Sequence, residues 1–112
     1  MGYRSDGVLA ITKDGLAKLL IHDVRMPEIL SEMKSSVVGD HHYWTYQGFK
    51  MYEQYPDVAE LHQWLDFLEE TIGIEDFAYI RLGEDDDDIL SMGDPCEFDI
   101  HIERSISTAA EW

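Results

Sequence analysis

Cysteine, proline and long apolar runs are scarce in this chain of 112 residues. The single cysteine, Cys96, allows no disulfide within the chain, and nothing in the sequence indicates an oxidising compartment. The apolar run at residues 8–11 is too short for a secretory signal or a membrane-spanning helix. Three prolines and no glycine- or serine-rich linker predict one globular domain over residues 1–112, which we expect in the cytoplasm.

Basic residues are also scarce: 8 Lys and Arg stand against 24 Asp and Glu, a formal net charge of −16 at pH 7. This balance excludes direct binding of nucleic acid or of an anionic membrane through a basic patch. The charge is uneven, because residues 1–52 hold six acids and six bases while residues 53–112 hold 18 acids and only Arg81 and Arg104. Such an acidic half favours solubility or a cationic partner.

The familiar motifs of catalysis and cofactor binding are absent. The chain contains no G-x-G-x-x-G, P-loop or G-x-S-x-G sequence, and its five histidines form no H-E-x-x-H. The acids at 84–88 fail the calcium-loop spacing, because a loop beginning at Asp86 would need a ligand at Leu90 and glycine at Ser91. We therefore expect no enzyme activity, no cofactor and no metal site.

Adjacent or nearby candidate ligands also point apart on a strand. His41 and His42 are consecutive and would face opposite sides of a strand, so they cannot readily share an ion. Cys96 and His101 are separated by an odd number of residues and would also lie on opposite faces, which excludes a nucleophile and base pair. With 24 acids, suitable carboxylate pairs arise by chance and carry no weight.

Hydrophobic residues make up 45% of the chain and aromatic residues 12%, enough for a packed core. The clearest helix begins at Pro56 and runs to about Ile72, with its apolar residues on one face. Thr12 could cap an earlier helix whose buried stripe would be Leu16, Leu19 and Leu20. A further helical segment starts at Met26 and Pro27 and carries Ile29, Leu30 and Met33, and a turn is predicted at Gly39 and Asp40. Strands are predicted at residues 8–12, 41–52 (interrupted at Gly48), 77–82, 89–92 and 96–102. The expected fold is α+β, an antiparallel sheet of about four strands with helices packed on one face and the other face wet.

Carboxylates gather at two places in this predicted sheet and on the back of its long helix. The helix carries Asp57, Glu60, Asp66, Glu69 and Glu70 outside its apolar stripe. Strict alternation in residues 96–102 would place Cys96, Phe98, Ile100 and Ile102 on the covered face of the last strand. The acids would lie on its other face, near an acidic loop. The predicted partner-binding residues are Glu84, Asp85, Asp86, Asp87, Asp88, Glu97, Asp99 and Glu103.

Aromatic residues cluster in the middle of the sequence. Tyr43, Trp44, Tyr46, Phe49, Tyr52 and Tyr55 could form a stacking platform for bases, but such platforms need a positively charged groove. Core packing for some rings and a protein interface for others is the expected arrangement, because tyrosine and tryptophan are enriched at interface hot spots.

Several short segments together resemble a family of small acidic proteins encoded by tailed bacteriophages and prophages. The matching segments are residues 2–6, 50–52, 55–58, 80–85, 93–95 and 104–106, which read GYRSD, KMY, YPDV, IRLGED, GDP and RSI. The chain departs from the family at Met51, where members often have tryptophan, and at Gly7, where they often have an apolar residue. The resemblance implies a phage or prophage origin and carries no catalytic residues with it.

Charge and resemblance together predict a phage-encoded, non-enzymatic inhibitor of a bacterial defence protein, of the anti-CRISPR or anti-restriction type. Its acidic face would imitate nucleic acid and bind the basic nucleic-acid-binding surface of a host protein, with no direct contact to nucleic acid or membrane. An alternative is an immunity-type or regulatory protein that binds one toxin or host enzyme through Trp44, Tyr46 and Tyr52. A small metal-dependent enzyme is the third possibility.

Overall fold

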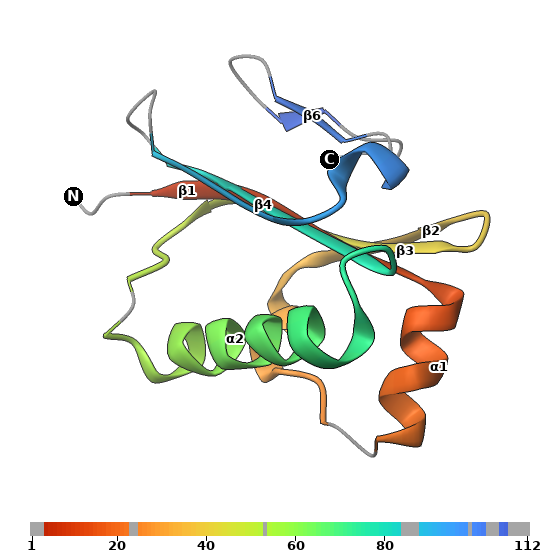
Figure 1. Cartoon of the computed structure of the whole chain (residues 1–112). Helices are drawn as coiled ribbons and strands as arrows, with labels where there is room; N and C mark the ends of the chain where they lie inside the picture. Colours follow the sequence, from red (N-terminus) through yellow and green to blue (C-terminus); the bar gives the residue numbers. More distant parts are fainter. Residues whose placement is uncertain are drawn as a thin grey trace.

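The computed structural model describes residues 4–22, 25–52, 54–83, 88–98, 100–102 and 106–107. It places them in an antiparallel sheet with helices beneath it (Figure 1). The strand order is β2-β3-β1-β4-β5. The predicted α+β class is confirmed, with five strands in this sheet where about four were expected. These strands are β1 (Ser5–Thr12), β2 (Lys34–Val38), β3 (His41–Phe49), β4 (Phe77–Leu82) and β5 (Ile89–Gly93).

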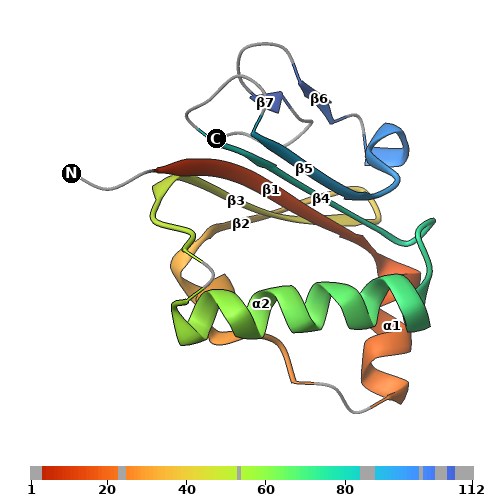
Figure 2. The ribbon, with the colours of Figure 1, turned by 60° about the vertical axis from the view of Figure 1, so that its left-hand side comes forward.

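Helices α1 (Lys13–Ile21) and α2 (Pro56–Phe67) cover one face of the sheet (Figure 2). The predicted cap of α1 is confirmed, because the Thr12 hydroxyl accepts a hydrogen bond from the Gly15 N–H at 3.0 Å. Proline stands in the first turn of α2, as predicted. The helix continues as a π-helical turn, η2 (Leu68–Ile72), and ends at Gly73, whose N–H bonds the Leu68 carbonyl.

The core between the sheet and the helices contains side chains from both. The apolar stripe of α2 lies in this core, as predicted. Val58, Leu61, Leu65, Leu68 and Ile72 are all buried there. The segment after Pro27 forms a short 3₁₀ helix, η1 (Glu28–Glu32), rather than a longer α-helix. It contributes to the same core through buried side chains that the sequence singled out, Ile29, Leu30 and Met33.

Strand β3 ends earlier than predicted but is irregular where expected. It stops at Phe49, and the register with β1 shifts between Ser5 and Gly7, opposite Gly48 (φ +69). The sequence did not predict β2. This edge strand pairs with β3 across the predicted turn at Gly39 and Asp40, and it has little apolar alternation because most of it is exposed.

The second face of the sheet is covered, so the expected wet face is wrong. Phe98 and Ile100 are buried against Val8, Ala10 and other residues of this face. The predicted strand over 96–102 is also wrong: a 3₁₀ helix, η3 (Pro95–Phe98), occupies its first part. Of the described residues in this segment, His101 and Ile102 alone form a strand, β6 (His101–Ile102), which pairs with β7 (Ile106–Ser107). These elements lie on the side of the sheet opposite the helices (Figures 1 and 2).

Candidate functional site

Most of the predicted partner-binding acids lie outside the described residues. These are Glu84, Asp85, Asp86, Asp87, Asp99 and Glu103. Glu97 belongs by its backbone to η3, and its side chain is outside the described part of the chain. Because η3 is helical, the backbone of Glu97 does not belong to the strand along which the row of carboxylates was expected.

Asp88 lies just before β5 and is engaged within the protein. Its carboxylate accepts a hydrogen bond from the Arg81 guanidinium at 3.1 Å, and its carbonyl accepts one from the Gly83 N–H at 2.8 Å. The two contacts close the loop between β4 and β5. The charge of Asp88 is therefore offset by one of the two basic residues of the acidic half.

Helix α2 and the turn η2 carry five exposed acidic residues, which we call the acidic helix surface. It consists of Asp57, Glu60, Asp66, Glu69 and Glu70. Residues 51–80 contain no Lys or Arg, and none of these five carboxylates forms an ion pair with a described residue. Glu69 and Glu70 stand near the C-terminal end of the helix, where the dipole disfavours acids. Local helix stability therefore does not explain them.

Asp76, which follows η2 in the chain, helps to hold the fold together. Asp76 accepts hydrogen bonds from the Thr12 hydroxyl at 3.0 Å and from the Lys18 ammonium at 2.5 Å. The hydrogen bond from Lys18 to Asp76 raises the pKa of this exposed lysine. These contacts join the start and the middle of α1 to the segment before β4.

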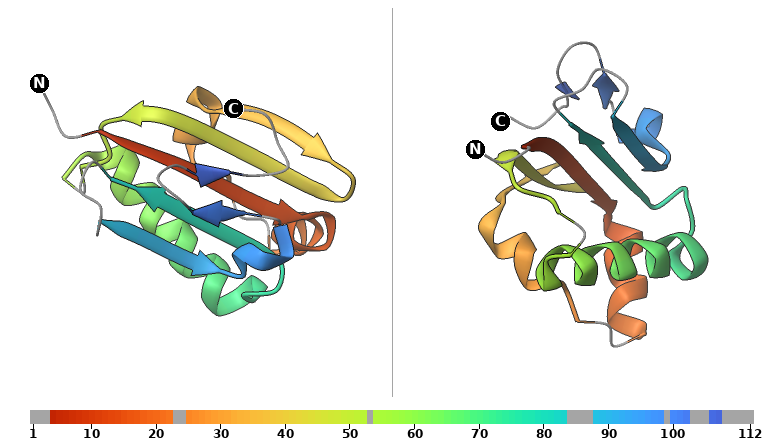
Figure 3. Two further views of the ribbon diagram at one scale, coloured as in Figure 1. Left: turned by 90° about the horizontal axis from the view of Figure 1, so that it is seen from above. Right: turned by 90° about the vertical axis from the view of Figure 1, so that its left-hand side faces the viewer.

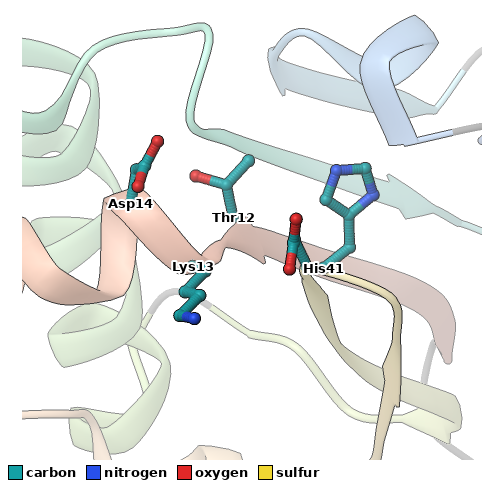
Figure 4. Close-up of a pocket in the computed structure, with 5 residues that line it drawn as sticks. Thr12, Lys13, Asp14 and His41 are labelled. Atoms are coloured by element: carbon teal, nitrogen blue, oxygen red, sulfur yellow. The ribbon is translucent and has the colours of Figure 1, made fainter.

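A polar pocket of about 210 Å³ lies at the N-terminal end of α1 (Figure 4). Its lining does not form a nucleophile and base, because the Thr12 hydroxyl is bonded to Asp76 and to the Gly15 N–H. The His41 ring packs at 4.7 Å from the Phe98 ring. The described residues contain no group of three or more metal-ligating side chains here or elsewhere. The lining residues are Thr12, Lys13, Asp14, Asp40 and His41.

The central aromatic cluster is mostly core. Trp44 and Tyr46 are 8% and 3% exposed, so these two residues do not form the exposed aromatic surface on which the immunity-type alternative depends. Tyr52 is partly buried and packs edge to face on the more exposed Tyr55. His41 and His42 face opposite sides of the sheet, as predicted: the first contacts Phe98, and the second stacks on Trp44 at 4.1 Å.

Two buried tyrosines meet beside a glycine of β1. The hydroxyls of Tyr46 and Tyr79 are hydrogen-bonded at 2.7 Å. Burial raises the pKa of Tyr79 to about 12 and raises that of Tyr46 well above its usual value of 10. Both phenols therefore stay protonated at neutral pH, and the pair forms a buried hydrogen bond of the core.

Replacing Gly7 with alanine tests this packing. A Cβ at Gly7 would lie 2.2 Å from the Tyr46 ring, and this buried ring has little room to move. We expect Gly7→Ala to lower the free energy of unfolding by about 1–3 kcal/mol, measured by urea denaturation. Adding Tyr46→Leu should reduce the cost of the alanine. An additive double variant would contradict the contact.

Sequence reasoning missed a second surface feature, an apolar pocket of about 330 Å³ between α1 and β3. The sequence predicted Leu20 in the buried stripe of the first helix with Leu16 and Leu19, and for Leu20 this is wrong, because it is 82% exposed. Only the fold places this apolar side chain at a pocket beside β3. The lining residues are Leu16, Leu19, Leu20, Met26, His42 and Trp44.

No helix in the described residues is both long and apolar enough to cross a membrane. Comparison of the chain with protein-family models, with curated proteins and with solved structures found no match.

Proposed function

We propose that this protein is a non-enzymatic inhibitor that binds a basic, nucleic-acid-binding surface of another protein. The observation that carries the proposal is the acidic helix surface: five exposed carboxylates without an ion pair to any described residue, on a segment with no Lys or Arg. Channels that bind nucleic acid are lined with basic residues, and opposite potentials speed encounter and align the partners. The acids at 84–87 belong to the same acidic half of the sequence.

The partner we propose is a bacterial defence protein, the target of an inhibitor of the anti-CRISPR or anti-restriction type. We propose this class because the sequence resembles small acidic phage proteins. The inhibitor would act in the cytoplasm of the host cell, where such proteins meet foreign DNA. Occupying the partner's basic channel would exclude DNA or RNA by charge and by space, without any chemical step.

Charge reversal on the helix tests this proposal. The protein first captures partners from a bacterial lysate at low salt, and mass spectrometry identifies those that elute as the salt concentration rises. The rate of association with the captured partner is then measured for the wild type and the variants. We expect Glu69→Lys with Glu70→Lys to slow association by about tenfold or more at low salt. Because lysine suits the C-terminal end of a helix, the variant should stay as stable as the wild type.

A matched control changes the same amount of charge in the neutral half. Asp14→Lys with Glu32→Lys leaves the acidic helix surface intact and should alter association far less. Duplex DNA should compete with the protein for the partner. Binding that is insensitive to salt and survives the reversal of Glu69 and Glu70 would overturn the proposal.

A further inference from the structure

Strand β2 leaves its outer side without a partner. It lies at one edge of the sheet, opposite β5 (Figure 3, left), and pairs with β3 alone. Val38 and His41 face each other across a two-residue turn, so they exchange backbone hydrogen bonds. Bonding positions alternate along such a ladder, and Ser35 and Val37 therefore direct their N–H and C=O groups outward. No described group bonds these outward groups.

Exposed apolar side chains adjoin this edge. Val37 is 65% exposed and lies across from His42, which lines the apolar pocket. Leu20 and Ile21 of α1 are 82% and 80% exposed, and Leu20 forms part of the same pocket. A long open edge beside apolar groups is a feature that natural proteins normally protect, because it pairs readily with another strand.

The charge of this region suits a second copy of the same chain. Strands β1, β2 and β3 and helix α1 all belong to residues 1–52, where six acids balance six bases. Two such faces can approach without net repulsion. The acidic half supplies β4 and β5 on the other side of the sheet, so pairing through β2 keeps these strands of the two copies at opposite ends of the assembly.

The strand is also complementary to itself. In an antiparallel pair centred on Ser36, Ser35 of each copy lies opposite Val37 of the other, and both residues offer their outward groups. The same register brings Lys34 diagonally beside Asp40 of the second copy, within reach of a long side chain. The two Val37 side chains become diagonal neighbours on the helix side of the sheet.

We infer that two copies of this chain associate through antiparallel β2–β2 pairing centred on Ser36, forming a continuous ten-stranded sheet. The exposed Val37, Leu20 and Ile21 are covered or brought together along this contact. The inference does not depend on the proposed inhibitor function, because it concerns the neutral edge of the sheet and not the acidic helix surface.

A cysteine at the centre of the strand tests the register. Ser36 would face Ser36 of the second copy at a non-hydrogen-bonded position, where Cα atoms are about 4.5 Å apart and a disulfide can form. In a Cys96→Ser background we expect Ser36→Cys to form a disulfide-linked dimer under mild oxidation. The matched control is Ser91→Cys, an exposed serine in the middle of the opposite edge strand β5, which should form no disulfide-linked dimer under the same oxidation.

Sedimentation measures the association without any cross-link. From about 1 to 100 μM, a range that resolves micromolar Kd values, the wild type should shift from monomer towards doubled mass. Val37→Lys places like charges beside each other across the contact and should raise the Kd at least tenfold. The control Ile89→Lys, at an exposed residue of β5, should leave it unchanged.

Three results would overturn the inference: a monomer throughout this range, a dimer that Val37→Lys does not weaken, or cross-linking at Ser91 and not at Ser36. A monomer whose capture of a different protein is lost in Val37→Lys would assign the edge to an extended segment of that partner instead.

Discussion

Gly93→Ala is expected to lower the free energy of unfolding by about 2–5 kcal/mol, because two costs add at this position. Gly93 has φ +76, a left-handed conformation that a Cβ disfavours. A Cβ there would also lie 2.1 Å from the Phe77 carbonyl oxygen, a backbone atom of β4 that cannot rotate away. The neighbouring Asp94 N–H bonds the same oxygen at 3.1 Å. The position ends β5 and leads into η3.

Gly39→Ala is the matched control for this prediction. Gly39 also has a positive φ, +60, but a Cβ would meet no atom within 4 Å. Only the conformational cost applies, about 1–2 kcal/mol. Urea denaturation of both variants separates strain from steric contact. Equal losses would contradict the close approach of Gly93 to β4.

Phe98→Ala is expected to cost about 3–5 kcal/mol, the second large effect, because its side chain fills the second face of the sheet. Phe98 is fully buried, with its ring 4.7 Å from His41 and 6.4 Å from Tyr43. The Tyr43 hydroxyl also donates to the Phe98 carbonyl at 3.0 Å. If this face were open to solvent, the substitution would cost little. Urea or thermal denaturation of the variant measures this loss and distinguishes a covered face from an open one.

Phe67→Ala provides the comparison on the helix side. Phe67 is only partly buried and touches the His22 ring edge to face at 6.0 Å. Phe67→Ala should lower the free energy of unfolding clearly less than Phe98→Ala does, since the Phe67 side chain buries less apolar area in the folded protein. If Phe98→Ala were as stable as Phe67→Ala or more stable, the segment after β5 would not cover the sheet.

The self-association inferred for β2 and the proposed role of α2 use different parts of the molecule. The sheet order places the neutral first half, with β1, β2 and β3, on one side and β4 and β5 of the acidic half on the other. A dimer joined at β2 would therefore present two acidic helix surfaces. If the charge-reversed helix variant fails to bind a partner and still dimerises, the two functions are separate.

Local signals in the sequence predicted the elements that local physics determines. The apolar stripe of α2 and the Thr12 cap each depend on neighbours within a few residues, so they could be identified before the fold. The irregularity at Gly48 was predictable because glycine readily adopts the positive φ found there. The exposed carboxylates of α2 were predicted for the same reason, as residues outside the stripe. The acidic loop at 84–87 is outside the described residues.

The segment after β5 illustrates the limit of pattern reasoning. Alternation predicted that Phe98 and Ile100 would be buried, and both are. The backbone is not a strand there, since η3 forms and the Ile100 N–H bonds the Pro95 carbonyl. A segment that crosses a sheet face can bury alternate side chains without joining a ladder, so burial was predictable and secondary structure was not.

By itself the sequence determined which residues are apolar, where the long helix runs and how the charge divides between a neutral and an acidic half. Only the tertiary structure decided that β2 is a strand at an open edge, that Trp44 and Tyr46 are core, and that both faces of the sheet are covered. Strand order and face coverage depend on pairings between residues far apart in the chain, and no local pattern encodes them.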